Sequence, residues 1–493
     1  METADTWRRS GLGLVVLCAG LWLAVSVGAF AYFRATHTSR VQPIYYITGD
    51  EPHYLVIATS LQRDGDLDLL NNYRDKHYLP FYPHHLGDPR DMHEMHAIYG
   101  RGGAVYSKHP IGLPLMLLPL FRNGDPFGVN ILMMVLTGLL GVQVFLLARD
   151  LTGALWPSLA AWAAGLFAAP LFLYADQIYP EVPGALLLVI AVRAVLSRQP
   201  RWWQALLVGG CVALLPWLHL RYGPTAALVA GTWLLAGGWR RRWQWPLMGL
   251  PAVASLAGLL VFYDWLFGGV PAVGEFGMVS LGNIAVGAAG LLLDQQYGLL
   301  VYAPVYVLAL WGLVQLGWLR VPHAWVPLLV VGTYYAFLAS FSYWFGAWSP
   351  PARMLVFVAP LLAALIAIPL ARWNSPGVWG AFYVLAAAGY WIVYQLLLTP
   401  SLRYNLWDGT SVLLAHLSEQ WGMELVALFP SYIEPNRVSV IWGIAAPVVL
   451  IAAGWLLRRG ERRDTEWRSP SRQRQGDDTP RLAVVGSVGR SGS

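Results

Sequence analysis

The chain has 493 residues, of which 57% are hydrophobic and only 12% are charged. Soluble domains carry roughly twice that share of charge, so the composition excludes an ordinary water-soluble protein. The formal net charge of +6 lies mainly in short connections and in the C-terminal tail, where it indicates membrane topology and contact with anionic lipid. No nucleic-acid-binding motif accompanies that charge, so we expect no nucleic-acid partner.

The apolar residues fall into twelve runs near the twenty or so residues that cross a bilayer. Each run should be a helix, because backbone amides in hydrocarbon must be satisfied within their own segment. The predicted spans cover residues 11–33, 126–148, 154–175, 182–197, 204–220, 222–238, 246–267, 298–318, 324–342, 354–371, 377–398 and 437–457. The sequence therefore predicts an all-α integral membrane protein with about twelve transmembrane helices.

Arginines mark one side of the predicted bundle, since they precede the first span and follow even-numbered spans. These residues are Arg8, Arg9, Arg198, Arg201, Arg240, Arg241, Arg242, Arg320, Arg372, Arg458 and Arg459. Positive residues gather in cytoplasmic loops of membrane proteins. Both termini are therefore predicted to be cytoplasmic, and the first long connection is predicted to be extracytoplasmic.

The chain divides into a cytoplasmic N-terminus at 1–10, a membrane domain at 11–457 and a tail at 458–493 that is predicted to be disordered. The outer loops of the membrane domain are expected at 34–112, 268–297 and 399–436. We expect a helix over 51–62, a re-entrant or interfacial stretch over 111–121 and one amphipathic helix over 412–428. Cys18 and Cys211 lie within predicted spans, so neither a disulfide framework nor a cysteine zinc site is expected.

Two adjacent acids, Asp50 and Glu51, stand at the start of the helix that is predicted in the first outer loop. Neighbouring carboxylates at a membrane surface are costly to keep unpaired. One interpretation is that one of them caps the helix and interacts with its dipole. The other interpretation is that they carry chemistry.

Residues 49–54, Gly-Asp-Glu-Pro-His-Tyr, resemble the Asp-Glu-x-His motif in the first outer loop of protein O-mannosyltransferases. More broadly, they are similar to the acidic motif after the first span in GT-C glycosyltransferases, including oligosaccharyltransferases and the aminoarabinose transferases of lipid A. The architecture resembles theirs over residues 1–451. The resemblance implies an enzyme that moves a sugar, with inversion, from a polyprenyl-phosphate-linked donor to an extracytoplasmic acceptor. Asp50 would be the base that takes the proton of the acceptor hydroxyl, and Glu51 and His53 would orient it.

The leaving phosphate of such a reaction needs cationic stabilisation. Arg221 and Arg353 are predicted on the outer side, against the positive-inside trend, and Lys108 lies near the end of the first outer loop. We assign these three residues to the donor phosphate. The alternatives are arginines that extend toward lipid headgroups and an ordinary interfacial lysine.

Asp176 and Glu181 lie in a short outer loop between the third and fourth spans. The resembling enzymes often place a second acidic residue there for metal or acceptor contact, so we count both acids as auxiliary residues, together with His109. For Glu181 the alternative is a helix cap after a proline.

A metal site has two candidate sets. Asp50 with Glu181 could hold Mg²⁺ or Mn²⁺, as in oligosaccharyltransferases, although many resembling enzymes need no metal. His93 and His96 are spaced to share one helical face and could hold a divalent ion. Since no established zinc spacing completes that pair, we expect surface histidines instead.

We therefore expect a multi-pass bacterial cell-membrane transferase whose active site is extracytoplasmic and whose acceptor is a cell-envelope glycan, lipid or protein. Two alternatives stay open. A lipid or solute transporter or flippase would carry ionisable residues at mid-span, whereas here they cluster at the outer ends of the spans. An O-antigen-type ligase or polymerase usually has its large outer loop late in the chain, whereas here that loop comes first.

Overall fold

The computed structural model describes residues 2–37, 47, 49–82, 96–122, 124–197, 201–237, 239–269 and 278–467. It is mostly helical, at 72%. Five of the described helices are long and apolar enough to cross a membrane, and their spans cover residues 13–32, 127–152, 242–267, 376–398 and 437–456. The protein is therefore all-α with helices of the membrane-spanning kind.

The first half of the chain forms most of the helices near its predicted spans, together with several short helices and two short strands. Its elements are α1 (Glu2–His37), α2 (Glu51–Arg63), α3 (Leu70–Arg74), β1 (Ala97–Tyr99), η2 (Arg101–Gly103), β2 (Val105–Ser107), α5 (Gly112–Leu117), α6 (Phe127–Thr152), α7 (Leu155–Phe167), α8 (Glu181–Val195), α9 (Trp202–Leu218), η3 (Leu220–Tyr222), α10 (Gly223–Gly237), η4 (Trp239–Gln244) and α11 (Trp245–Phe267). The helix predicted over 51–62 is confirmed as α2. Only six residues of the stretch 111–121 are α-helical, in α5.

The second half is more broken. Its elements are η6 (Leu281–Asn283), α12 (Ile284–Leu293), α13 (Leu299–Tyr302), η7 (Pro304–Tyr306), α14 (Val307–Gln315), η8 (Leu316–Trp318), α15 (Trp325–Ala339), η9 (Arg353–Leu355), α16 (Ala359–Leu365), α17 (Ala367–Trp373), α18 (Pro376–Leu398), η10 (Pro400–Arg403), α19 (Val412–Trp421), α20 (Leu425–Leu428) and α21 (Arg437–Trp467). The predicted span 298–318 is divided at Pro304, which has no backbone N–H for the helical ladder.

The second half differs from its predicted elements at three places. The described part of the predicted loop 268–297 contains α12, where a side chain on Gly287 or Gly290 would collide with Ala339 or Trp344. These glycines serve close packing, not a turn. The single amphipathic helix predicted over 412–428 is two helices, because Gly422 adopts a left-handed φ of 65° between them. The last helix continues to Trp467, ten residues past the predicted span, and residues 468–493 lie outside the described residues.

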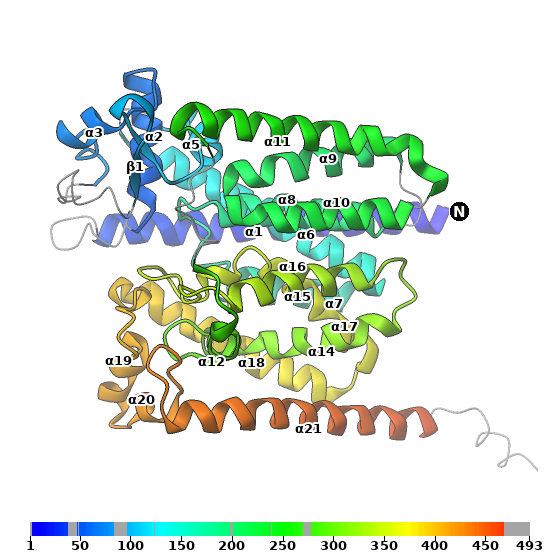
Figure 1. The fold of residues 1–493 in the computed structure, drawn as a ribbon. Helices are drawn as coiled ribbons and strands as arrows, with labels where there is room; N and C mark the ends of the chain where they lie inside the picture. The colour runs from blue at the N-terminus through cyan, green and yellow to red at the C-terminus, as the bar shows by residue number, and fades with distance from the viewer. Residues whose placement is uncertain are drawn as a thin grey trace, which may run out of the picture.

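The long helices run side by side (Figure 1). Helix α9 packs against α8, α10 and α11, and α6 packs against α1, α7, α8 and α16. The start of α1 and the end of α21 lie at one end of this bundle, while α2, α3, β1, α5, α19 and α20 gather at the other end. We call that second end the loop end. It holds the two-stranded antiparallel hairpin in which Ala97 pairs with Ser107.

Candidate functional site

Asp50 occupies the N-cap position of α2, but its carboxylate does not cap the helix. It forms an ion pair with the guanidinium of Arg353, which lies 303 residues away in the chain. Gly49 makes this possible because its φ of +61° turns the chain just before Asp50, and a side chain there would collide with the Tyr179 hydroxyl. The capping interpretation of Asp50 is therefore wrong for this structure.

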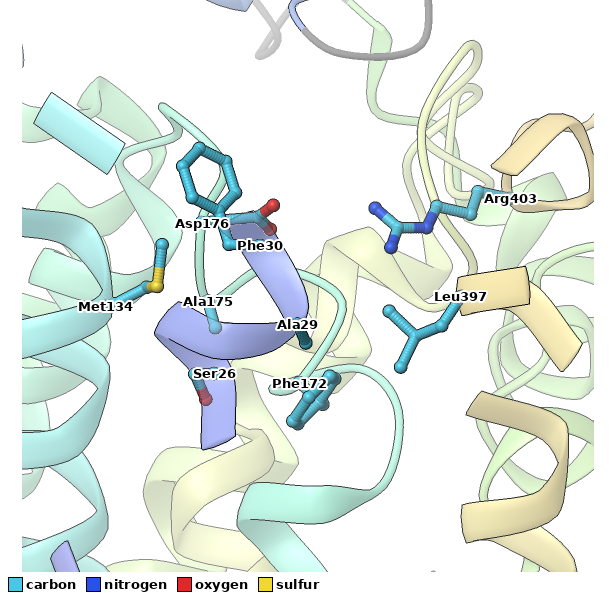
Figure 2. Close-up of a pocket in the computed structure, with 9 residues that line it drawn as sticks. All are labelled: Ser26, Ala29, Phe30, Met134, Phe172, Ala175, Asp176, Leu397 and Arg403. Carbon is cyan, nitrogen blue, oxygen red and sulfur yellow. The ribbon is translucent and has the colours of Figure 1, made fainter. Parts of the chain in front are cut away.

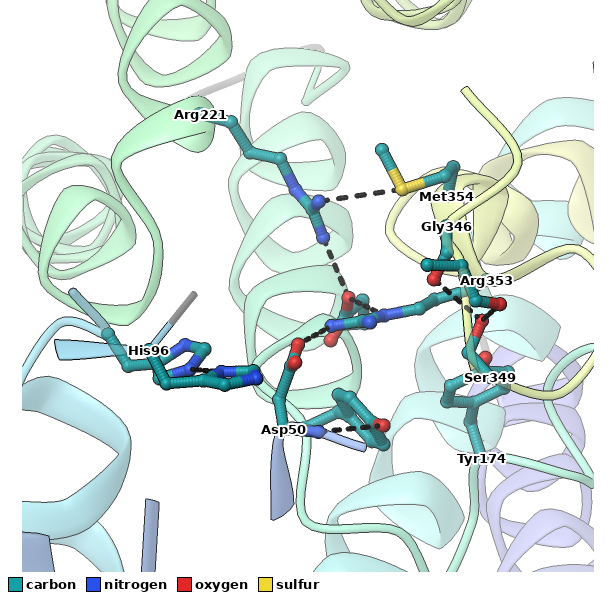
Figure 3. Close-up of polar contacts among 12 residues, drawn as sticks. Asp50, His96, Tyr174, Arg221, Gly346, Ser349, Arg353 and Met354 are labelled. Atoms are coloured by element: carbon teal, nitrogen blue, oxygen red, sulfur yellow. Dashed lines mark hydrogen bonds and ion pairs between the residues drawn. The ribbon is translucent and has the colours of Figure 1, made fainter. Parts of the chain in front are cut away.

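Glu181 joins the two arginines that Figure 3 labels, Arg221 and Arg353. Its Oε1 accepts hydrogen bonds from Nη2 of Arg221 at 2.7 Å and from Nε of Arg353 at 3.2 Å. The Glu181 side chain is fully buried, and the Arg221 side chain is 3% exposed. Glu181 is the first residue of α8, yet its carboxylate joins two guanidinium groups and does not cap that helix.

The arginines are set in place by the segments around them. Arg353 opens the short helix η9 directly after Ala352, whose φ of 59° is left-handed and uncommon for a residue with a side chain. The Arg353 guanidinium lies over the Tyr179 ring, 4.3 Å from its centroid, which adds a cation–π contact. Arg221, in η3, also places Nη1 3.6 Å from the sulfur of Met354. Both arginines thus sit in fixed, buried positions.

Glu51 contributes a third carboxylate but points elsewhere. It is fully buried, and its Oε1 accepts the backbone N–H of Ile178 at 2.8 Å. This contact ties α2 to the loop before α8, and so it holds Asp50 and Glu181 next to each other. The observed role of Glu51 is positional.

The charges of the ion-paired residues balance. Two carboxylates, from Asp50 and Glu181, pair with the guanidinium groups of Arg221 and Arg353. Burial alone would raise the pKa of Asp50, but the Arg353 guanidinium holds that pKa well below its usual range. Asp50 is therefore ionised, and a purely cationic phosphate pocket is not what the two arginines form.

Beside Asp50 lies a cluster of three imidazoles. Nδ1 of His96 is 3.2 Å from Nε2 of His109, and the His53 ring stacks on the His96 ring with centroids 3.7 Å apart. Burial lowers the pKa of all three side chains, that of His109 to about 4. His53 is 2% exposed, and His96 is half-buried within this cluster, so the prediction of a surface histidine is wrong for His96, while His93 lies outside the described residues.

Lys108 and Asp176 lie at different borders of this region. Lys108 is partly buried beside the histidines, and its backbone N–H donates to the carbonyl of His96 at 2.9 Å. Asp176 instead lines a crevice of about 320 Å³ with Arg403, and the two charged groups face each other across it (Figure 2). The remaining walls are mainly apolar, including Phe30 and Phe172.

Arg403 is the functional candidate that the sequence did not reveal. It is 4% exposed, and its Nε donates to the carbonyl of Leu396 at 3.1 Å. The next residue, Tyr404, accepts a hydrogen bond from Gln177 at 2.9 Å, in the loop that also carries Asp176. One signal was available, namely an arginine in a connection that is predicted to be outer, where the positive-inside trend leaves it unexplained.

Fold and site together define an all-α protein with membrane-type helices and a buried carboxylate–guanidinium network at the loop end. No protein-family model matches the chain, and no curated protein matches it either.

Proposed function

We propose that this protein is a membrane glycosyltransferase of GT-C type that moves a sugar from a polyprenyl-phosphate-linked donor to an extracytoplasmic acceptor. One observation carries the proposal. Asp50, Glu181, Arg221 and Arg353 come from four distant parts of the chain and meet at the loop end. A transferase for phospholipid-linked sugars needs a carboxylate and cations together at a membrane surface. In this proposal the helices in the twelve predicted ranges cross the membrane, both termini are cytoplasmic and the loop end is outside.

Asp50 is the base in this proposal because its side chain is 21% exposed, whereas that of Glu181 is fully buried. As the acceptor oxygen bonds to the anomeric carbon, the bond from that carbon to the phosphate oxygen breaks. The electron pair of the broken bond stays on the phosphate, and Asp50 takes the acceptor proton. The anomeric centre is inverted because the acceptor attacks the face opposite the leaving group.

The ion pair with Arg353 would control when Asp50 acts. A carboxylate held by a guanidinium is a weak base. A donor phosphate competes for Arg353, since guanidinium groups bind phosphate in a bidentate manner. When Arg353 turns to the phosphate, Asp50 loses the partner that lowers its pKa and becomes more basic. Donor binding would thus activate the base.

Two cavities supply places for the two parts of the donor. The crevice between Asp176 and Arg403 combines apolar walls with a buried cation, which suits a lipid chain next to a phosphate. A second cavity of about 330 Å³ is lined by His109 and by the rings of Tyr106, Phe262 and Tyr263. Aromatic faces of this kind are common contacts for sugar rings. Membrane lipids surround the helices in this arrangement.

The test is sugar transfer in proteoliposomes supplied with radiolabelled polyprenyl-phosphate sugars and a membrane-extract acceptor. Asp50→Asn should lower turnover by at least ~100-fold, the lower end of the range for general base catalysis, without loss of folded protein. Asp75→Asn is the matched control, because Asp75 is an exposed acid of the same outer segment. Normal turnover by Asp50→Asn would contradict the catalytic assignment. Failure of the wild type to transfer any donor of the panel would contradict the proposed function.

A further inference from the structure

We infer that Asp50, His96 and His109 form a binding site for a divalent transition-metal ion, with Zn²⁺ as the preferred ion. One ligand atom from each of these three side chains lies within 4.8 Å of the other two. The inference rests on the proposed function only for what the ion would do, because metal binding can be measured without any sugar donor.

The distance between the two imidazoles is that of two ligands of one tetrahedral ion. Zinc–nitrogen bonds of about 2.0–2.1 Å at a tetrahedral angle separate two nitrogens by roughly 3.3–3.4 Å. Nδ1 of His96 and Nε2 of His109 are 3.2 Å apart. Two imidazole nitrogens that face each other so closely can share one proton or one metal ion. The metal would replace the shared proton.

The hairpin holds both imidazoles in this relation. His96 directly precedes β1, and His109 is the second residue after β2. The two histidines therefore lie at the open end of one antiparallel pair. The backbone N–H of Lys108 donates to the carbonyl of His96, and the backbone N–H of His109 donates to Oγ of Ser107 at 3.0 Å. The histidines are thus positioned by backbone pairing, which does not depend on an ion.

A second layer of contacts fixes the rings. His53 stacks on His96, and Nδ1 of His53 forms a hydrogen bond of 2.9 Å with the hydroxyl of Tyr73. The Tyr54 ring lies 4.7 Å from the His109 ring. Metal-binding histidines are oriented by outer partners of this kind. His109 also lines the cavity of about 330 Å³, so an ion has a path to the site.

The donor set selects the class of metal. Two imidazoles and one carboxylate suit zinc and other first-row transition metals, whereas Mg²⁺ requires mainly oxygen ligands. Between Asp50 and Glu181, where the sequence left Mg²⁺ or Mn²⁺ as one candidate, Arg353 pairs with both carboxylates. The ion would therefore bind Asp50 on the side of His96 and His109, away from Arg353.

Charge supplies the reason for an ion at this place. The two guanidinium groups of Arg221 and Arg353 are already neutralised by the carboxylates of Asp50 and Glu181. A divalent ion would make the site net positive. In the proposed function it would give the donor phosphate the positive charge that the arginines offer only in part.

The experiment uses the full chain in detergent, without a polyhistidine tag, after removal of metals by a chelator. Wild-type protein should take up one Zn²⁺ per chain, measured by mass spectrometry of the metal, and should not take up Mg²⁺ in its place. Loading with Co²⁺ should give the intense visible absorption bands of a tetrahedral site. His96→Ala and His109→Ala should weaken Zn²⁺ binding at least ~100-fold, because loss of a direct ligand exceeds loss of an outer partner.

His416→Ala is the matched control, since His416 lies in α19 at the same end of the bundle and outside the cluster. Circular dichroism checks that each variant is folded, and His109→Gln replaces His109→Ala if the latter is not. Binding of less than one Zn²⁺ per chain by the wild type, or equal loss in His416→Ala, would overturn the inference. Metal binding without sugar transfer would refute the proposed function alone, and transfer unaffected by chelation would refute the catalytic use of the ion.

Discussion

Replacing Glu181 by glutamine removes one negative charge from the centre of the network and leaves its shape almost unchanged. The glutamine oxygen can still accept a hydrogen bond, but it cannot neutralise two guanidinium groups. Breaking a buried ion pair by removing one partner costs about 3–5 kcal/mol, because the other charge stays buried. The cost falls mainly on Arg221, whose side chain is 3% exposed, since Arg353 keeps its ion pair with Asp50. We expect Glu181→Gln to lower the free energy of unfolding by that amount.

Asp50→Asn should cost less, about 1–2 kcal/mol, because Asp50 is partly exposed and Arg353 keeps Glu181. The assay is reversible unfolding in mixed micelles at rising dodecyl sulfate content, followed by circular dichroism. The buried thiol of Cys211 is a second reporter, since it reacts with a thiol probe only when the bundle opens. Asp75→Asn should leave the unfolding curve unchanged. A smaller effect of Glu181→Gln than of Asp50→Asn would refute the central place given to Glu181.

Three further predictions concern neighbouring residues. Gly49→Ala places a side chain on a left-handed backbone position and against Tyr179, which should displace Asp50. Turnover in the transfer assay should therefore fall ~10- to 100-fold. An unchanged rate would contradict this positioning role of Gly49. Glu51→Ala should lower the free energy of unfolding by about 1–3 kcal/mol in the micelle assay, because the buried N–H of Ile178 loses its acceptor. Glu51→Gln should lower it by less. Equal effects of the two variants would show that the hydrogen bond is unimportant. Arg403→Gln should raise the KM for the lipid-linked donor with little change in kcat, and a fall in kcat alone would place Arg403 outside donor binding.

The general placement of the site follows from topology, while its contacts do not. Positive-inside counting puts Asp50, Glu181, Arg221 and Arg353 near one membrane face, and the structure joins these four by ion pairs. The choice of partners was not predictable, because it depends on rotamers and on the left-handed turn at Ala352. Both arginines were assigned to a phosphate, and the structure pairs both with carboxylates.

The histidine pair illustrates a second limit. His96 and His109 meet because a hairpin folds between them, and three-residue strands leave almost no periodic signal in a sequence. The helix pattern was easier to predict, since long apolar runs such as α6 and α18 are decided by composition alone. Where glycines serve packing, as at Gly287, the same residue type suggested a loop and the prediction failed.

The residues of the ion-pair network are synthesised at different times. Asp50 and Arg353 are 303 residues apart, and at about 5–20 residues per second their syntheses are separated by roughly 15–60 s. Glu181 and Arg221 are only 40 residues apart and can pair within seconds of each other. Asp50 is therefore synthesised well before its partner Arg353. The network of Asp50, Glu181, Arg221 and Arg353 is complete only after η9 has been made, so a chain that stops before η9 contains Asp50 without Arg353.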